Sequence, residues 1–162
     1  MGETIVTARI YMFMLMTLAV GFVLQYFPLA DFMSWFVPEW VLMVFIFWQL
    51  KLPGLINFWW VWPIGLLLDV QESLPLGTSV LGFAVVLYVL QLMYQRLKIF
   101  NAVQQAFVIF LLICCYQLIT YWGLLIVSDS SQPLTLWVPS LVSILVWPWM
   151  YVALLSTYQK LR

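Results

Sequence analysis

The chain has 162 residues, of which 66% are hydrophobic and 7% charged, with a formal net charge of zero and no histidine. A soluble domain carries about 25% charged residues because its surface faces water, so this composition excludes a soluble globule and predicts an integral membrane protein. The absence of a basic tract excludes a nucleic-acid partner. Without histidine, and with the only two cysteines adjacent (Cys114 and Cys115), we expect no metal site and no cofactor.

The first apolar stretch, from Ile10 to Ala30, carries no charge. It is long enough for a helix across a hydrocarbon core of about 30 Å. The stretch is longer than an ordinary signal-peptide core and lacks a small-x-small cleavage site before Gln25. It therefore predicts a retained first membrane helix.

The second apolar stretch lies between Glu39 and Lys51. Pro38 suits the first turn of a helix, and Pro53-Gly54 ends it, so we expect about 15 residues, or about 22 Å. This length is short against a core of about 30 Å. Two interpretations stay open: an ordinary short helix whose Lys51 reaches the interface, or a helix that starts in a sheltered, wet outer pocket holding Glu39.

The third span is expected over Phe58 to Leu68, extending back through Leu52, and the fourth over Ser73 to Gln95. Between them, the spacing of Asp69 and Glu72 fits a capping box at a helix start. Asp69 also follows a helix, at the negative end of its dipole, where a carboxylate needs a partner. With Glu39, this acidic pair is the candidate outer cavity or partner rim.

Two glycines flank that acidic pair. Gly65 allows neighbouring helices to approach closely, and Gly77 permits a backbone turn that other residues disfavour. Small residues four apart, Thr17 with Gly21 and Thr78 with Gly82, are also suited to helix contact.

The last two spans are expected within Ile99 to Ser128 and Ser130 to Gln159. Pro148 should kink the last helix, and Trp147 and Trp149 beside it should pack against neighbouring helices. Gln91 and Gln117 are polar residues within apolar stretches, so each is expected to be buried and to need a hydrogen-bond partner.

The charges indicate six crossings with both termini in the cytoplasm, because basic residues in short loops favour the cytoplasmic side. The inner segments then hold Arg9, Lys51, Arg96, Lys98, Lys160 and Arg162, and the outer loops hold Asp31, Glu39, Asp69, Glu72 and Asp129. Tryptophans such as Trp35, Trp40 and Trp59 are predicted to lie at the membrane–water interface as anchors. The alternative is that they form an aromatic ligand-binding site. We predict one domain, residues 1–162, of six membrane helices.

No catalytic pattern is present. The sequence contains no Ser-His pair, zinc-protease motif, phosphate-binding loop or dinucleotide-binding motif. An intramembrane aspartyl enzyme would need two acids facing each other within the bilayer, whereas Asp69 and Glu72 fall at the end of a span. The protein is therefore expected not to be an enzyme.

Three segments carry a family resemblance. They are Pro38-Glu39-Trp40-Val41-Leu42, Gly65-x-x-x-Asp69 with Leu76-Gly77, and Leu145-Val-Trp147-Pro148-Trp149. In this order and spacing the chain resembles, over nearly its whole length, the family of the rod shape-determining protein MreD. One departure is Ser73, where the family often has glycine.

The resemblance implies a non-enzymatic scaffold of the cell-elongation machinery in the bacterial inner membrane. Such a scaffold would couple the single-span protein MreC to MreB filaments and peptidoglycan synthases. RodZ, RodA and an elongation-specific penicillin-binding transpeptidase are further implied partners, and a homodimer stays open. The family's fold is similar to the substrate-binding subunits of energy-coupling-factor transporters, so the alternative function is a solute-binding membrane subunit of such a transporter.

Overall fold

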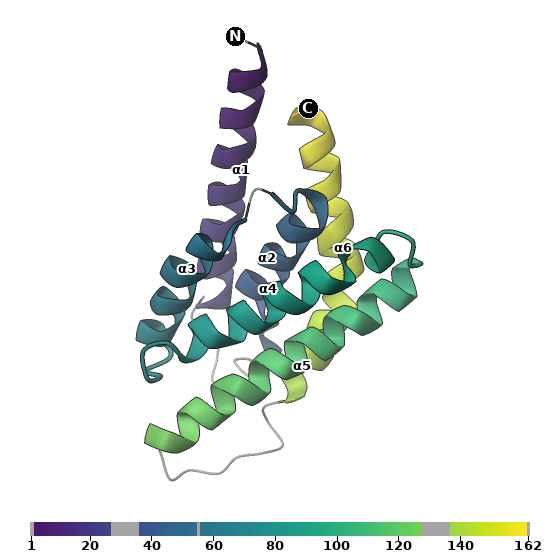
Figure 1. The fold of residues 1–162 in the computed structure, drawn as a ribbon. Coiled ribbons are helices and arrows are strands. Elements are labelled where there is room, and N and C mark those ends of the chain that lie inside the picture. The colour runs from purple at the N-terminus through teal and green to yellow at the C-terminus, as the bar shows by residue number, and fades with distance from the viewer. Residues whose placement is uncertain (1, 27–35, 55, 128–136, 162) are drawn as a thin grey trace.

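The computed structural model describes residues 2–26, 36–54, 56–127 and 137–161, and the regular elements within these ranges are α-helices. The helices are α1 (Gly2–Gln25), α2 (Trp40–Lys51), α3 (Phe58–Gln71), α4 (Thr78–Leu97), α5 (Ala102–Val127) and α6 (Val138–Leu161). The start of α1 and the end of α6 lie at the same end of the bundle (Figure 1). The predicted all-α fold is confirmed. Asp31, Trp35, Asp129 and Arg162, which entered the topology prediction, lie outside the described residues.

Within the described ranges, four helices contain segments long and apolar enough to cross a membrane: Ala8–Gln25, Thr78–Leu97, Gln104–Ile126 and Val138–Lys160. Two helices are shorter. Helix α2 has 12 residues and α3 has 14, or about 18 Å and about 21 Å at 1.5 Å per residue.

Both short helices begin later than predicted. Pro38 lies outside α2, because the N-cap residue Glu39 has a non-helical ψ of 72°. The predicted extension of the third span back to Leu52 is wrong, because α3 starts at Phe58, after Asn57 in an extended conformation. Pro53-Gly54 ends α2 as expected.

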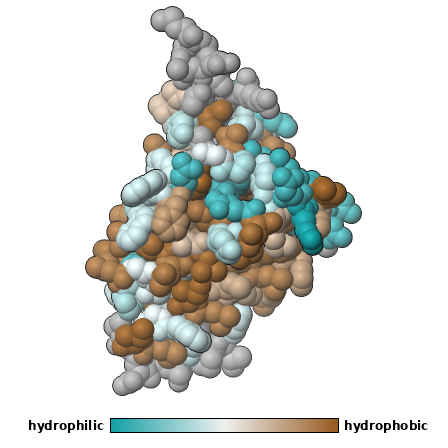
Figure 2. All heavy atoms as spheres, in the orientation of Figure 1, coloured by the Kyte–Doolittle hydropathy of each residue, from teal (hydrophilic) through white to brown (hydrophobic). Residues whose placement is uncertain are grey.

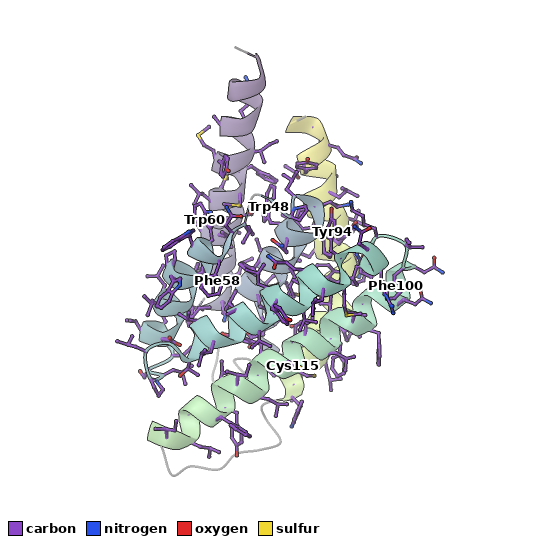
Figure 3. All side chains as sticks on the ribbon, viewed as in Figure 1. Trp48, Phe58, Trp60, Tyr94, Phe100 and Cys115 are labelled. Carbon is purple, nitrogen blue, oxygen red and sulfur yellow. The ribbon has the colours of Figure 1, made fainter. Side chains whose placement is uncertain are left out.

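Helix α2 forms the centre of the bundle. All ten residues from Val41 to Leu50 are buried, so the helix is covered on every side. Trp48 (labelled in Figure 3) packs edge-on against Phe13 of α1 and Tyr158 of α6, with ring centroids 5.6 Å and 6.0 Å apart. Its indole Nε1 donates a hydrogen bond to Thr17 Oγ1 at 2.9 Å. The aromatic residues of α2 therefore hold α1 and α6 together.

Small residues allow the other helices to pack closely. A Cβ atom on Gly65 would lie 2.7 Å from the backbone of Val80, so α3 and α4 are almost in backbone contact. Gly82 faces the Tyr116 ring of α5. Two further close contacts involve residues of the Thr78–Gly82 and Thr17–Gly21 pairs. These are Thr78 against Gly123 and Gly21 against Val41.

The outer surface is largely apolar. Figure 2 shows hydrophobic atoms over most of the middle of one face, whereas hydrophilic atoms gather where α4 ends and α5 begins. Met12, Leu92 and Leu145 are among many large apolar side chains that are mostly exposed. Exposed apolar surface of this extent is typical of a protein covered by lipid.

Two expectations for individual side chains are wrong. Trp147 is buried, but Trp149 is 80% exposed, because residues two apart on a helix point in nearly opposite directions. Pro148 lies inside α6 as predicted. Gln91 is exposed on α4, in contrast to the expected burial.

Candidate functional site

Glu39, Asp69 and Glu72 lie at the end of the bundle opposite the start of α1. Glu39 is the N-cap of α2, Asp69 is in the last turn of α3, and Glu72 is the C-cap of α3. The three acids lie near one another because α1 and α3 end at the side of the bundle where α2 and α4 begin (Figure 1).

Gln25 at the end of α1 connects two of the acids. Its Nε2 donates to Glu39 Oε2 at 3.3 Å and to Glu72 Oε1 at 3.5 Å. Its Oε1 accepts a bond from the Val41 backbone N–H at 3.2 Å. The Tyr26 hydroxyl also donates to Glu72 Oε1, at 3.0 Å. The end of α1 is thus hydrogen-bonded to both short helices.

Helices α5 and α6 complete the cluster around Glu39. Gln117 Nε2 donates to Glu39 Oε1 at 3.4 Å, and Ser140 Oγ donates to Gln117 Oε1. The Glu39 backbone N–H donates to Ser143 Oγ at 3.1 Å. The expected partner for Gln117 is therefore confirmed. Sequence reasoning missed Gln25, Ser140 and Ser143, although uncharged polar residues near the same ends of apolar helices were a usable signal.

Asp69 has a different role from its neighbours. It is fully buried, and its Oδ2 and Oδ1 accept bonds from the backbone N–H groups of Gly77 at 2.6 Å and Ser79 at 2.7 Å. These groups begin α4, so a carboxylate at the negative end of α3 is stabilised by the positive end of the next helix. The partner that the dipole argument required is present.

The predicted capping box of Asp69 and Glu72 is wrong. Helix α3 continues to Gln71, and the next helix starts only at Thr78, so Asp69 caps α4 across a loop. Glu72 bonds to Tyr26 and Gln25 instead. The loop turns through Ser73 and Gly77, whose φ angles are +54° and +100°. Gly77 thus occupies a turn with a positive φ, which glycine adopts without strain.

A pocket of about 180 Å³ opens beside the cluster. Its lining residues are Glu39, Glu72, Leu74, Gln117, Thr120, Tyr121, Leu124 and Pro139. The volume suits a few water molecules or a small polar group. Asp69 is not among the lining residues, so the three predicted acids divide into two that line the pocket and one that holds the adjoining loop.

Burial raises the pKa of both pocket carboxyls. For Glu39 the pKa rises to about 8, because burial and the charge of Glu72 together outweigh hydrogen bonds from Gln117 and Gln25. Burial raises the pKa of Glu72 as well, against the opposing hydrogen bond from Tyr26. In the part of the chain that is described, neither carboxylate has a basic partner. The pocket can therefore hold a proton near neutral pH and accept hydrogen bonds from a visiting donor.

These features define a class: an all-helical membrane protein whose buried polar groups gather at one end of an apolar bundle. The family model for the rod shape-determining protein MreD matches residues 7–157, nearly the whole chain. The chain therefore belongs to the MreD family, as the motifs predicted, and has a role in rod shape determination. This family consists of shape-determining structural proteins and is not a known enzyme family. The family is associated with the MreB–MreC–MreD shape machinery, and MreC is a partner in the broad sense that it belongs to this machinery.

The search of solved structures found no match to the chain. The predicted similarity to transporter subunits is therefore untested and stays a prediction.

Proposed function

We propose that the protein is a non-enzymatic scaffold of the bacterial inner membrane that couples MreC to MreB filaments and to the peptidoglycan synthases. The match to the MreD family over residues 7–157 carries this proposal. Most of the described chain is helical, so the protein has helix surfaces and short connections with which to contact partners. RodZ, RodA and an elongation-specific transpeptidase would join through the same surfaces.

The proposed topology has six crossings with both termini in the cytoplasm. Three lysines lie at the end of the bundle where α1 begins, because they stand at the C-terminal ends of α2, α4 and α6: Lys51, Lys98 and Lys160. Glu39 and Glu72 lie at the opposite end. Basic residues favour the cytoplasmic side. Helices α2 and α3 are short for a core of about 30 Å, so the acidic end of each would be recessed below the outer surface.

The recessed pocket at Glu39 and Glu72 is the proposed contact for a partner segment from the outer side. Its carboxyl groups accept hydrogen bonds, and the apolar side chains of Leu74 and Pro139 also line it. A volume of about 180 Å³ is below the 300–1,000 Å³ typical of small-molecule sites. For a solute that enters from the outer side, this difference favours the scaffold over the solute-binding alternative.

Depletion of the protein in a rod-shaped host tests the proposed role. Cells should lose their rod shape and become round, and a plasmid copy of the gene should restore rods. A copy carrying Glu39→Gln and Glu72→Gln should restore rods less well than one carrying Lys98→Gln, although all should reach the membrane in equal amounts. Rods that persist after complete depletion would refute the scaffold.

A further inference from the structure

A recess lies at the end of the bundle where the chain begins and ends. Helix α2 ends there at Lys51, and Figure 1 shows the first turns of α1 and the last turns of α6 extending beyond it. A cavity of about 520 Å³ occupies this place, lined by Lys51, Leu155, Tyr158 and Gln159. The recess therefore combines one cation with two polar side chains that can donate hydrogen bonds.

Lys51 lacks a counter-charge among the side chains that the structure describes, which do not include that of Glu3. Its Nζ lies 4.8 Å from the centroid of the Tyr151 ring, and no acidic side chain among those described pairs with it. A half-buried ammonium group beside apolar helices is costly unless an anion or water reaches it. This arrangement favours a negatively charged ligand.

An apolar groove lies next to this recess, between α1, α2 and α6. Its volume is about 250 Å³, and its lining includes Phe13, Met16, Val20 and Leu154. Ring contacts connect the two places: Phe13 touches Trp48, which touches Tyr158 of the recess. Two ring contacts therefore separate Phe13 in the groove from Tyr158 in the recess.

We propose that the recess and groove together bind one anionic phospholipid. The phosphate contacts Lys51, Tyr158 and Gln159 donate hydrogen bonds to the headgroup, and one acyl chain lies along the groove. Along α1 the groove runs from Phe13 to Leu24, about 16 Å at 1.5 Å per residue. This length is close to the half-thickness of the hydrocarbon core, about 15 Å.

The lining of the groove suits an acyl chain. Its residues are almost all apolar, from Phe13 and Met16 to Met150 and Leu154, and a volume of about 250 Å³ can take up a narrow, flexible chain. Basic pockets between membrane helices are also known to bind anionic headgroups. The site requires only that this end of the bundle faces a leaflet containing such lipids.

Native mass spectrometry of the delipidated full-length protein tests the site, with phosphatidylglycerol and phosphatidylcholine of the same acyl chains as probes. We expect one phosphatidylglycerol to be retained in preference to phosphatidylcholine. Lys51→Gln should weaken its binding about fivefold. Lys98→Gln is the matched control, because Lys98 also lies over a tyrosine ring, 4.3 Å from the centroid of Tyr94, and should leave binding unchanged.

A second pair of variants tests the groove. Met12 and Met16 are 65% and 66% exposed on α1, but only Met16 lines the groove. Met16→Trp should weaken binding, and Met12→Trp should not. If Lys51→Gln fails to fold, the Met16→Trp and Met12→Trp variants still test whether the lipid binds in the groove.

Three results would overturn the proposal. They are equal retention of the two lipids, phosphatidylglycerol binding that survives Lys51→Gln or Met16→Trp, and equal thermal stabilisation by inorganic phosphate alone.

Discussion

Ser73 has a φ angle of +54°, in the left-handed region where glycine is favoured. It follows Glu72 in the loop that Asp69 closes by binding the start of α4. A side chain in this region costs of order 1–2 kcal/mol. The two hydrogen bonds that Asp69 accepts from the start of α4 close the loop in which Ser73 holds this conformation.

Ser73→Gly should stabilise the protein by about 1 kcal/mol, because glycine adopts this φ without strain. The midpoint of thermal unfolding in detergent measures the effect. Ser73→Ala is the control, since it removes the same hydroxyl but keeps a Cβ atom, and it should bring no gain. An equal gain from both variants would show that the hydroxyl, rather than the backbone, is the cause.

Glu39 should make stability depend on pH. Its pKa rises from an ordinary 4.5 to about 8 because of burial and the charge of Glu72, so between these values the folded state binds more protons than the unfolded chain. Stability should then fall as the pH rises from about 4.5 to about 8.

Glu39→Gln mimics the protonated acid and should flatten this slope. The variant should be more stable than the wild type by about 1–3 kcal/mol at pH 9 and nearly equal to it at pH 5. Thermal unfolding across this pH range measures both. Glu3→Gln, at the other end of α1, should keep the slope of the wild type. A variant that is less stable at pH 9 would contradict the raised pKa.

The close pairing of α3 with α4 depends on Gly65. A Cβ atom there would approach the backbone N and Cα of Val80 to 2.7 Å, and neither atom can move without shifting the helix. Gly65→Ala should therefore destabilise the protein by about 1–3 kcal/mol. Gly54→Ala is the control, because nothing lies within 4 Å of the added atom. Equal unfolding midpoints for the two variants would mean that the helices do not pack as closely as described.

Sequence patterns predicted the elements better than their boundaries. The positions of the charges and of Pro53-Gly54 predicted the six helices of the described ranges. Small residues marked two helix interfaces, at Gly65 between α3 and α4 and at Gly82 between α4 and α5. The start of α3 was missed because hydrophobicity continues through Leu52, although the backbone turns there. The role of Asp69 was also missed, because local spacing suggests a cap for the nearest helix start, whereas the partner N–H groups lie eight and ten residues away.

At the scale of the whole molecule, the distribution of charge gives the topology prediction. Reporter enzymes fused after Lys51, Glu72 and Lys98 should report cytoplasm, outside and cytoplasm, since basic residues favour the cytoplasmic side. Fusions at Lys51 and Glu72 that report the same side would show that α3 does not cross the membrane.

The polar cluster at Glu39 could be predicted only in part from the sequence. The three acids were found because charges are rare in apolar stretches. The separation of the pocket acids Glu39 and Glu72 from Asp69 was not predicted. It depends on hydrogen bonds from Gln25 of α1 and Gln117 of α5 to Glu39, and contacts between helices far apart in the sequence leave no spacing pattern. The buried position of α2 likewise follows from packing, since an apolar helix in a membrane protein can face lipid or protein.

Purification from membranes in mild detergent, followed by identification of the proteins and small molecules that remain bound, tests the scaffold most directly. We expect MreC to co-purify in stoichiometric amount with the wild type and with Lys98→Gln, and in reduced amount with the Glu39→Gln, Glu72→Gln variant. A bound solute together with ATPase subunits, and no MreC, would contradict the scaffold and support the transporter alternative.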